Sequence, residues 1–347
     1  MVTLKLTSLS ACAAILSACA PVPADRFDMT HSQITLPNDQ NGDDQPDTVG
    51  VKALQSFSHR DYFYLDANKR MVFVAPNKGL TTPNSTNARS ELRYMLRGMD
   101  MAIADGSPRN HFALQAHPTA FEFAAIGGKM SATLHVDAVS QNATYADKPP
   151  AYSIVVGQIH GKKTKSKANG FGWGNEPLKI HYKKWPNHKT GSVFWNYERN
   201  LPKDDPNRID IAYTVWGSDW DDDTDPGSEG IALGESFSYT VNVYGDIMHL
   251  TFESENRGTV RHQINLANNI DAEGRVDRFD HKQGYSGDML YFKAGAYNQC
   301  SPKDAPSFRY PACPGTGNLA IDMENGNYAQ ATFSRLIVGA AAPPEKR

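Results

Sequence analysis

Residues 291–299 read Tyr-Phe-Lys-Ala-Gly-Ala-Tyr-Asn-Gln, a run in which polar and apolar side chains alternate. On a β-strand, successive side chains point to opposite faces, so Phe292, Ala294 and Ala296 would share one face. The other face would carry Tyr291, Lys293, Gly295, Tyr297 and Gln299. Two interpretations fit this pattern: an amphipathic strand whose polar side meets water, or the wall of a groove that grips an anion.

The rest of the chain has the same preference for strands. Short runs of β-branched and aromatic residues alternate with clusters of Gly, Pro, Asn and Asp, and no long run has helical periodicity. The expected strands are Tyr62–Leu65, Met71–Ala75, Phe121–Phe123, Lys129–Val136, Tyr152–His160, Leu178–Tyr182, Ser192–Tyr197, Ile209–Trp216, Phe237–Tyr244, Met248–Phe252 and Thr332–Val338. Many strands with few helices predict an all-β fold, an antiparallel sandwich or jelly roll built as one domain.

The N-terminus resembles a bacterial lipoprotein signal. Lys5 precedes the apolar run Leu6–Ala18, which is too short to span a membrane as a mature helix. The run leads into Leu16-Ser17-Ala18-Cys19, which resembles a lipobox cut before the cysteine, so Cys19 would be acylated. The alternative is an ordinary secretory signal that happens to contain cysteines.

This interpretation divides the chain into a signal peptide at residues 1–18, a tether at 19–26, one domain at 27–340 and a C-terminal tail at 341–347. We expect the protein to be exported, as an outer-membrane or cell-surface lipoprotein or otherwise as a periplasmic or secreted protein. Its only contact with a membrane would be the lipid on Cys19.

The remaining cysteines predict a disulfide. With Cys19 lipidated, Cys300 and Cys313 are left to pair in an oxidising compartment. No metal site is expected there, because the two cysteines lack a second ligand pair at zinc-like spacing. The acidic residues 38–47 are faintly similar to a calcium loop but lack the final Glu of an EF-hand, which favours a solvated turn.

A second marked stretch is Arg89-Ser90-Glu91-Leu92-Arg93. The net charge of the chain is only -3, which does not indicate a nucleic-acid binder. An anion would therefore have to be bound by a local cluster of charges. On a strand, Arg89, Glu91 and Arg93 line one face, where two guanidiniums suit carboxylate recognition and Glu91 can hold both in place. The alternative is a surface ion-pair ladder that adds little stability.

A third stretch, Gln158-Ile159-His160, closes an apolar run. Gln158 and His160 share a face and Ile159 turns to the core. Alone this tripeptide is a weak signal, and a structural histidine is the default interpretation. Together, however, three strands repeat one design, with apolar residues on one face and hydrogen-bonding or ionisable residues on the other.

This inventory of side chains favours one chemistry. Glycoside hydrolysis usually needs two working carboxylates, and the pair Glu253 and Glu255 lies in a polar, turn-prone segment. No nucleophile elbow for a Ser-His-Asp triad is present. Arg and Gln could instead neutralise the carboxylate of a uronic acid and stabilise the enolate-like charge that follows loss of the C5 proton. His or Tyr would take that proton, and Tyr could return one to the departing O4.

At these residues the chain resembles the alginate lyases of polysaccharide lyase family 7. That family is marked by Arg-(Ser/Thr)-Glu-Leu-Arg, Gln-(Ile/Val)-His and Tyr-Phe-Lys-Ala-Gly-x-Tyr-x-Gln, and all three occur here in that order. Softer similarity covers most of the mature chain, including the segments 27–37, 74–79 and 175–180. The resemblance implies a jelly-roll β-sandwich of two antiparallel sheets whose concave sheet forms the substrate cleft.

The resemblance also implies residue roles in cleaving the 1,4-glycosidic bonds of alginate by β-elimination. Arg89 and Gln158 would neutralise the substrate carboxylate, and His160 would assist them or act as base for guluronate. Tyr297 would be the general acid, and for mannuronate the base as well. The expected substrate-binding and supporting residues are Glu91, Arg93, Lys293 and Gln299. The family's chemistry needs no metal or other cofactor, and Ile159 is loosely associated there with guluronate.

Two other functions fit the same residues. The chain could be a lyase for another polyuronate such as glucuronan, or a non-catalytic sugar-binding jelly roll on the cell surface. The partner in the preferred hypothesis is alginate, and we expect a monomer. Longer loops at 162–173, 219–230 and 300–313 would make the enzyme act on chain ends if they wall off the cleft, and inside chains if they lie at its rim.

Overall fold

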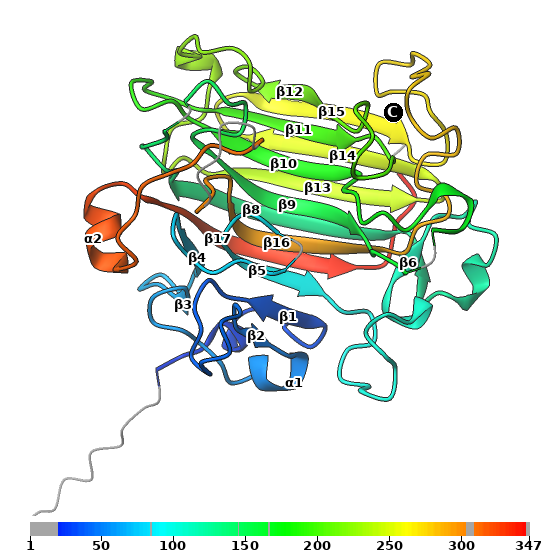
Figure 1. The fold of residues 1–347 in the computed structure, drawn as a ribbon, viewed down its shortest axis with the longest axis horizontal. Coiled ribbons are helices and arrows are strands. Elements are labelled where there is room, and N and C mark those ends of the chain that lie inside the picture. Colours follow the sequence, from blue (N-terminus) through cyan, green and yellow to red (C-terminus); the bar gives the residue numbers. More distant parts are fainter. Residues whose placement is uncertain (1–19, 84, 145, 166, 303–308, 345–347) are drawn as a thin grey trace, which may run out of the picture.

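Two β-sheets lie face to face in the computed structural model (Figure 1). The structure describes residues 20–344 apart from 84, 145, 166 and 303–308, so Cys19 and the expected signal peptide lie outside the described residues. All strand pairs in both sheets are antiparallel except one short parallel pair, β6 with β7. The all-β prediction is therefore confirmed.

The first sheet, which carries the three marked stretches, has ten strands. Eight of them follow one another across it in the order β12 (Asp210–Trp216), β11 (Ser192–Glu198), β10 (Leu178–Lys183), β9 (Ser153–Gly161), β16 (Leu290–Asn298), β5 (Arg89–Tyr94), β1 (Ser32–Thr35) and β2 (Thr48–Val49). The short strands β6 (Phe112–Ala113) and β7 (Ala125–Ile126) attach beside β16.

The second sheet has seven strands and backs the first. Its order is β15 (Gly258–Asn265), β14 (Ile247–Ser254), β13 (Phe237–Tyr244), β8 (Gly128–Ala138), β17 (Tyr328–Gly339), β4 (Met71–Pro76) and β3 (Phe63–Leu65). The α-helices among the described residues are α1 (Val51–Leu54) and α2 (Leu319–Glu324), and neither is long and apolar enough to cross a membrane.

The core lies between the sheets and confirms the expected facing of residues 291–299. Phe292, Ala294 and Ala296 of β16 all belong to the buried hydrophobic cluster. The second sheet contributes aromatic rings such as Phe73, which meets Phe333 edge-on at 5.3 Å between ring centroids. Because the apolar side of β16 is used in this way, its polar side must face outward from the sandwich.

Gly295 allows β5 to approach β16 closely. Its φ is +148°, and a Cβ built there would lie 2.5 Å from the carbonyl oxygen of Ser90. The strand also bulges against β9 between Ala294 and Tyr297. A bulge sharpens the local twist and re-aims the following side chain, here Tyr297.

Two strand predictions need correction. Phe121–Phe123 is not a strand: Ala120–Glu122 forms a short 3-10 turn, in which the side chain of Phe121 is 83% exposed. Aromatic residues raise strand propensity, but this run pairs with no strand of either sheet, and context decides β-structure. Conversely, β15 was not expected, because it is a polar edge strand paired only with β14.

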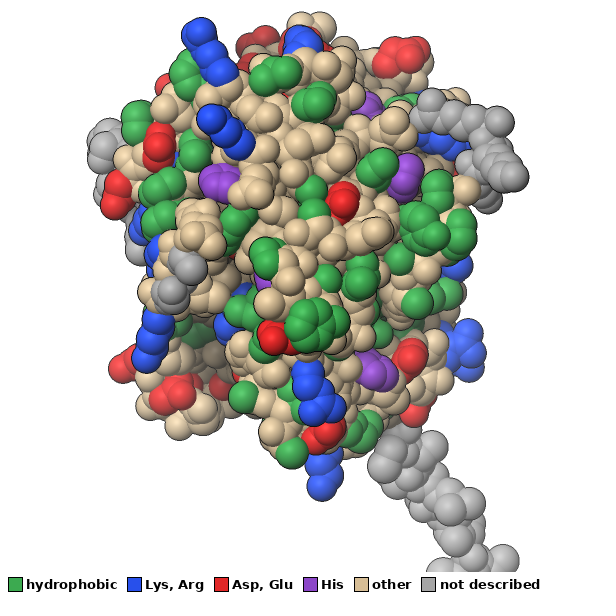
Figure 2. All heavy atoms as spheres, turned by 90° about the vertical axis from the view of Figure 1, so that its right-hand side faces the viewer, with side chains coloured by type: hydrophobic (Ala, Val, Ile, Leu, Met, Phe, Trp, Pro, Cys, Tyr) green, Lys and Arg blue, Asp and Glu red, His purple; other side chains and the backbone are tan. Residues whose placement is uncertain are grey.

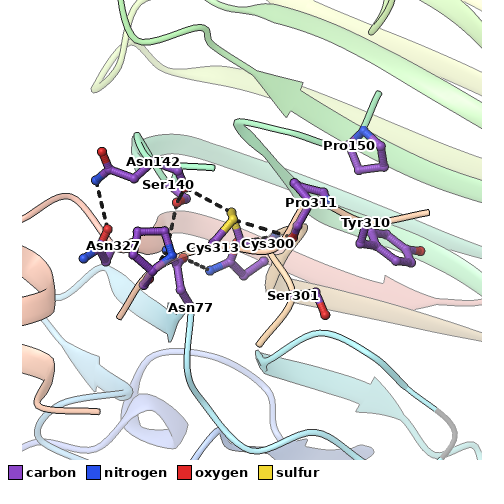
Figure 3. Close-up of a disulfide and its surroundings, with 12 residues drawn as sticks. Asn77, Ser140, Asn142, Pro150, Cys300, Ser301, Tyr310, Pro311, Cys313 and Asn327 are labelled. Atoms are coloured by element: carbon purple, nitrogen blue, oxygen red, sulfur yellow. Dashed lines mark hydrogen bonds between the residues drawn. A yellow bond between two sulfur atoms is a disulfide. The ribbon is translucent and has the colours of Figure 1, made fainter. Parts of the chain in front are cut away.

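Cys300 and Cys313 form the disulfide that the sequence predicts (Figure 3). It lies just after β16, where the side chain of Asn298 accepts a hydrogen bond from the amide of Cys300 and donates one to the carbonyl of Ala75 in β4. Closing a loop of this length stabilises a fold by about 3 kcal/mol in the chain-entropy model. The end of β16 is thus held from two sides.

One face of the molecule shows a mixture of side-chain types (Figure 2). On the face seen from the right-hand side of Figure 1, hydrophobic side chains are spread among charged ones (Figure 2). Hydrophobic residues scattered in this way are normal for a soluble surface.

Candidate active site

The three marked stretches meet on adjacent strands and face the same side. In the register of β5, β16 and β9, Arg93 pairs with Lys293, and Lys293 pairs with Gln158. Directly paired residues share a sheet face. The register therefore places on one face Arg89, Glu91, Arg93, Gln158, His160, Tyr291, Lys293 and Tyr297.

Glu91 is the buried centre of this cluster. Its carboxylate accepts hydrogen bonds from Arg89 Nη1 at 2.9 Å, from Gln158 Nε2 and from Lys293 Nζ. Only 1% of Glu91 is exposed, so it lies behind its partners and holds them. A carboxylate with three donors can fix the direction of each one.

The charges in this cluster shift one another's pKa values. Burial alone would raise the pKa of Glu91, but Lys293 and Arg89 lower it. Burial and the neighbouring Arg89 lower the pKa of Lys293 to about 8. Burial opposes the charged form of Arg89, yet negative charge at Tyr297 and Glu91 raises its pKa. At neutral pH the cluster thus holds two cations against one carboxylate and favours an anionic ligand.

Tyr297 lies against Arg89. The guanidinium carbon is 3.9 Å from the centroid of the tyrosine ring. Ser85 joins the two groups, because its hydroxyl accepts from Arg89 Nη2 at 2.6 Å and is 3.3 Å from the Tyr297 hydroxyl. Ser85 was not predicted from the sequence, since it lies in a loop outside the motifs.

Arg93 corrects one expectation. Glu91 holds Arg89 but not Arg93, which forms an ion pair with Asp105 at 3.2 Å. Its second nitrogen is 3.1 Å from His111, and its guanidinium lies over the ring of Tyr291 at 4.2 Å. Asp105 lies in a loop, 12 residues after Arg93 in the sequence. The facing of side chains along a strand therefore does not reveal this pair.

Gln299 lies just beyond the end of β16. It is buried, and its amide nitrogen donates to the carbonyl of Tyr297 at 3.2 Å. This contact braces the backbone that carries Tyr297.

His160 has an acceptor at each ring nitrogen. Nε2 is 2.9 Å from a carboxylate oxygen of Glu176, and Nδ1 is 2.7 Å from the carbonyl of Gly161. A ring in this position satisfies both contacts only when it carries both protons. The imidazole also stacks on Tyr291 with 5.2 Å between centroids. In this arrangement both ring nitrogens of His160 are occupied by protein partners.

Glu176, the partner of His160, lies outside the three motifs and was not predicted as a site residue. Burial opposes its ionised form, but Lys179 and His160 hold the pKa of Glu176 well below its ordinary value. Glu198 lies beside it, and burial together with the charge of Glu176 raises the pKa of Glu198 well above its ordinary value. The sequence contained one signal for Glu176. It is the only acidic residue in the segment 175–180, which is similar to the family pattern and leads into β10.

The cluster has the parts needed for proton abstraction next to a carboxylate. The Nε–H groups of Arg89 and Arg93 are buried and meet no acceptor among the residues that the structure describes. Arg97 and Arg257 share this feature, so the suitability for an anionic ligand comes from the two cations gathered around Glu91. Within the described part of the chain, no three His, Cys, Asp or Glu side chains gather as metal ligands would.

The comparisons with known proteins agree on one family. A family model described as alginate lyase matches residues 27–340. The chain is 33% identical over 291 residues to an alginate lyase from Klebsiella pneumoniae, covering 81% of this chain and 86% of that protein.

Solved structures give the same result. The crystal structure of the alginate lyase from Klebsiella pneumoniae superposes with a TM-score of 0.71 at 29% identity, covering 93% of this chain and 99% of that one. The exolytic family 7 alginate lyase AlyA5 from Zobellia galactanivorans superposes with a TM-score of 0.72 at 32% identity, with the same two coverages.

Proposed function

This chain belongs to the alginate lyase family, polysaccharide lyase family 7, and we propose that the cluster on β5, β16 and β9 is the centre at which it cleaves alginate. As a family member it is a polysaccharide lyase. The observation that carries the assignment of the centre is that Arg89, Gln158 and Lys293 all donate to the buried Glu91 on the sheet face that also bears Tyr297.

Arg89 and Gln158 neutralise the substrate carboxylate in this proposal. Arg89 is held by Glu91 and Ser85, and Gln158 is fixed by the same Glu91. Donors that are fixed before the substrate arrives need no reorganisation when charge develops on the carboxylate. Lys293 adds positive charge to that environment, and Arg93 binds a neighbouring carboxylate.

Tyr297 moves the protons. Its oxygen takes the C5 proton and returns a proton to O4 as the glycosidic bond breaks, which balances the elimination. The guanidinium of Arg89 lies against its ring. His160 would serve as base only after releasing Glu176, because both its nitrogens are occupied.

A preference for guluronate stays a prediction. It was based on Ile159, which is fully buried in the core. Ile159 therefore has no direct contact with a sugar in the cleft and could act only through the positions of Gln158 and His160.

Export and an N-terminal lipid on Cys19 are also part of the proposal, supported by the lipobox-like sequence. The protein would be an outer-membrane or cell-surface lipoprotein that works as a monomer. Membrane fractionation of cells that express the wild type or Cys19→Ser checks the anchor: only the wild type should sediment with membranes.

The activity is tested on separate substrates. Purified protein should raise the ultraviolet absorbance of the conjugated unsaturated uronate on polymannuronate, polyguluronate or mixed blocks. The ratio of the initial rates gives the block preference. Absorbance on glucuronan alone would favour the other lyase, and binding without absorbance on any block would favour a non-catalytic sugar binder.

A further inference from the structure

The strands β10 and β11 belong to the same sheet as the candidate active site. Their side chains on the active-site face are buried. Lys179 pairs with Gln158 and His181 pairs with Val155, so both lie on the face of the cluster. Their neighbours on β11 are Asn196 and Phe194. All four of these β10 and β11 residues are at most 5% exposed, although no core packs on this side.

A tryptophan from the loop at 219–230, which begins with the acidic run Asp219–Asp225, covers these residues. Trp220 is itself buried, and its ring meets His181 edge-on at 5.0 Å and Phe194 at 5.4 Å between centroids. Lys183 of β10 holds the backbone of this loop, because its Nζ donates to the carbonyl of Trp220 at 2.6 Å. The same Nζ donates to the carbonyl of Pro149 at 2.8 Å.

Arg309 and Tyr310, which precede Cys313, add a second layer. Arg309 forms an ion pair with the buried Asp210 of β12, and its guanidinium carbon is 5.6 Å from the centroid of the Trp220 ring. Asp210 also pairs with Lys179 at 2.9 Å. The charges of this half of the sheet are thus paired with one another, and none of these groups is left to bind a uronate carboxylate.

Tyr310 brings this layer close to the reacting groups. Burial raises the pKa of Tyr310, and the next largest influence is the charge of Tyr297, followed by Lys179. Two strand spacings separate β16 from β10, about 10 Å in all. The covered region therefore begins close to Tyr297.

On the side of Tyr297 that leads towards β1, the residues of the same sheet face are partly exposed. Gln33 of β1 pairs with Arg93 and faces the same side, and Thr35 pairs with Glu91. Both are partly exposed. The side chains of Arg89 and Arg93 keep 12% and 14% of their surface exposed, in contrast to the buried residues on β10 and β11.

We propose that Trp220, Arg309 and Tyr310 form an end wall to the cleft, so that the enzyme accepts only the end of an alginate chain and releases short products of nearly constant size. A chain that crosses the strands along Arg93, Lys293 and Gln158 meets this wall at β10 and continues only towards β1. The inference rests on the proposed centre at Tyr297 and adds its mode of action.

The test follows viscosity and absorbance together during digestion of polymeric alginate. The end wall predicts that absorbance rises while viscosity falls slowly, with the same short products from the earliest time point. Rapid loss of viscosity at low absorbance, with a ladder of intermediate oligosaccharides, would overturn the end wall and leave the lyase assignment intact. No absorbance on any block would refute the proposed function instead.

Removing the wall gives a second measurement. The variant Trp220→Ala/Arg309→Ala should shift the products towards longer oligosaccharides and make viscosity fall faster for each bond broken. Tyr244→Ala, which removes an exposed aromatic ring from β13 in the other sheet, is the matched control and should keep the wild-type products. Unchanged short products from a folded double variant would show that these side chains do not limit the cleft.

Discussion

Tyr297→Phe should lose most of its turnover and keep its affinity for alginate. The substitution removes only the hydroxyl, and the phenylalanine ring can remain 3.9 Å from the guanidinium of Arg89. Acid–base groups contribute typically about 10²–10⁴-fold to a rate. We therefore expect kcat to fall by about that factor with little change in KM, measured by initial rates and by calorimetric binding of an alginate oligosaccharide.

Tyr244→Phe is the control for that experiment. Tyr244 is an exposed tyrosine of β13 in the other sheet, so loss of its hydroxyl should leave kcat unchanged. A wild-type kcat in Tyr297→Phe would remove Tyr297 from the mechanism. Loss of binding in that variant would show that the hydroxyl holds the substrate.

Glu91→Gln should cause the largest loss of stability of any single change in the site. Glu91 is the carboxylate partner that Arg89 and Lys293 share, and it is almost completely buried. Removing one member of a buried ion pair leaves the others uncompensated and costs about 3–5 kcal/mol. We expect urea unfolding to show this loss in the free energy of unfolding, together with a large fall in activity because Arg89 and Gln158 lose their anchor.

The contribution of Glu91 to folding stability should depend on pH in a definite direction. The folded protein holds the pKa of Glu91 below the ordinary value of 4.5. Its stabilising contribution is therefore present above pH 4.5 and is lost as the pH falls through the folded value. Glu91→Gln should flatten this acid-side loss of stability, measured as unfolding midpoints across the acidic range.

Two further variants separate the effect of leaving buried cations unpaired from the effect of losing a carboxylate elsewhere. Glu91→Gln/Lys293→Met should recover part of the lost stability, because it also removes one of the stranded cations. Glu273→Gln removes a carboxylate from an exposed ion pair with Arg275 and should leave the unfolding midpoint nearly unchanged. A Glu91→Gln protein as stable as the wild type would contradict the role of Glu91 as the centre of the cluster.

The sequence could predict what depends on alternation along a single strand. The period of two placed Phe292 and Ala294 in the core and Lys293 and Tyr297 on the opposite face, and the structure agrees. It failed at Phe121–Phe123 and at β15, where strand pairing rather than propensity decides the outcome. A short aromatic run without a partner forms a turn, and a polar run beside a paired strand becomes an edge strand.

The sequence by itself thus determined the fold class, the family and the residues that face the cleft, because strand periodicity and the three motifs are local properties. Only the tertiary structure decided which charges pair: Glu91 with Lys293, Arg93 with Asp105, and His160 with Glu176. It also decided that Trp220 and Arg309 cover β10 and β11. These contacts join segments far apart in the chain, and their partners are fixed by strand order and loop path, which no local pattern contains.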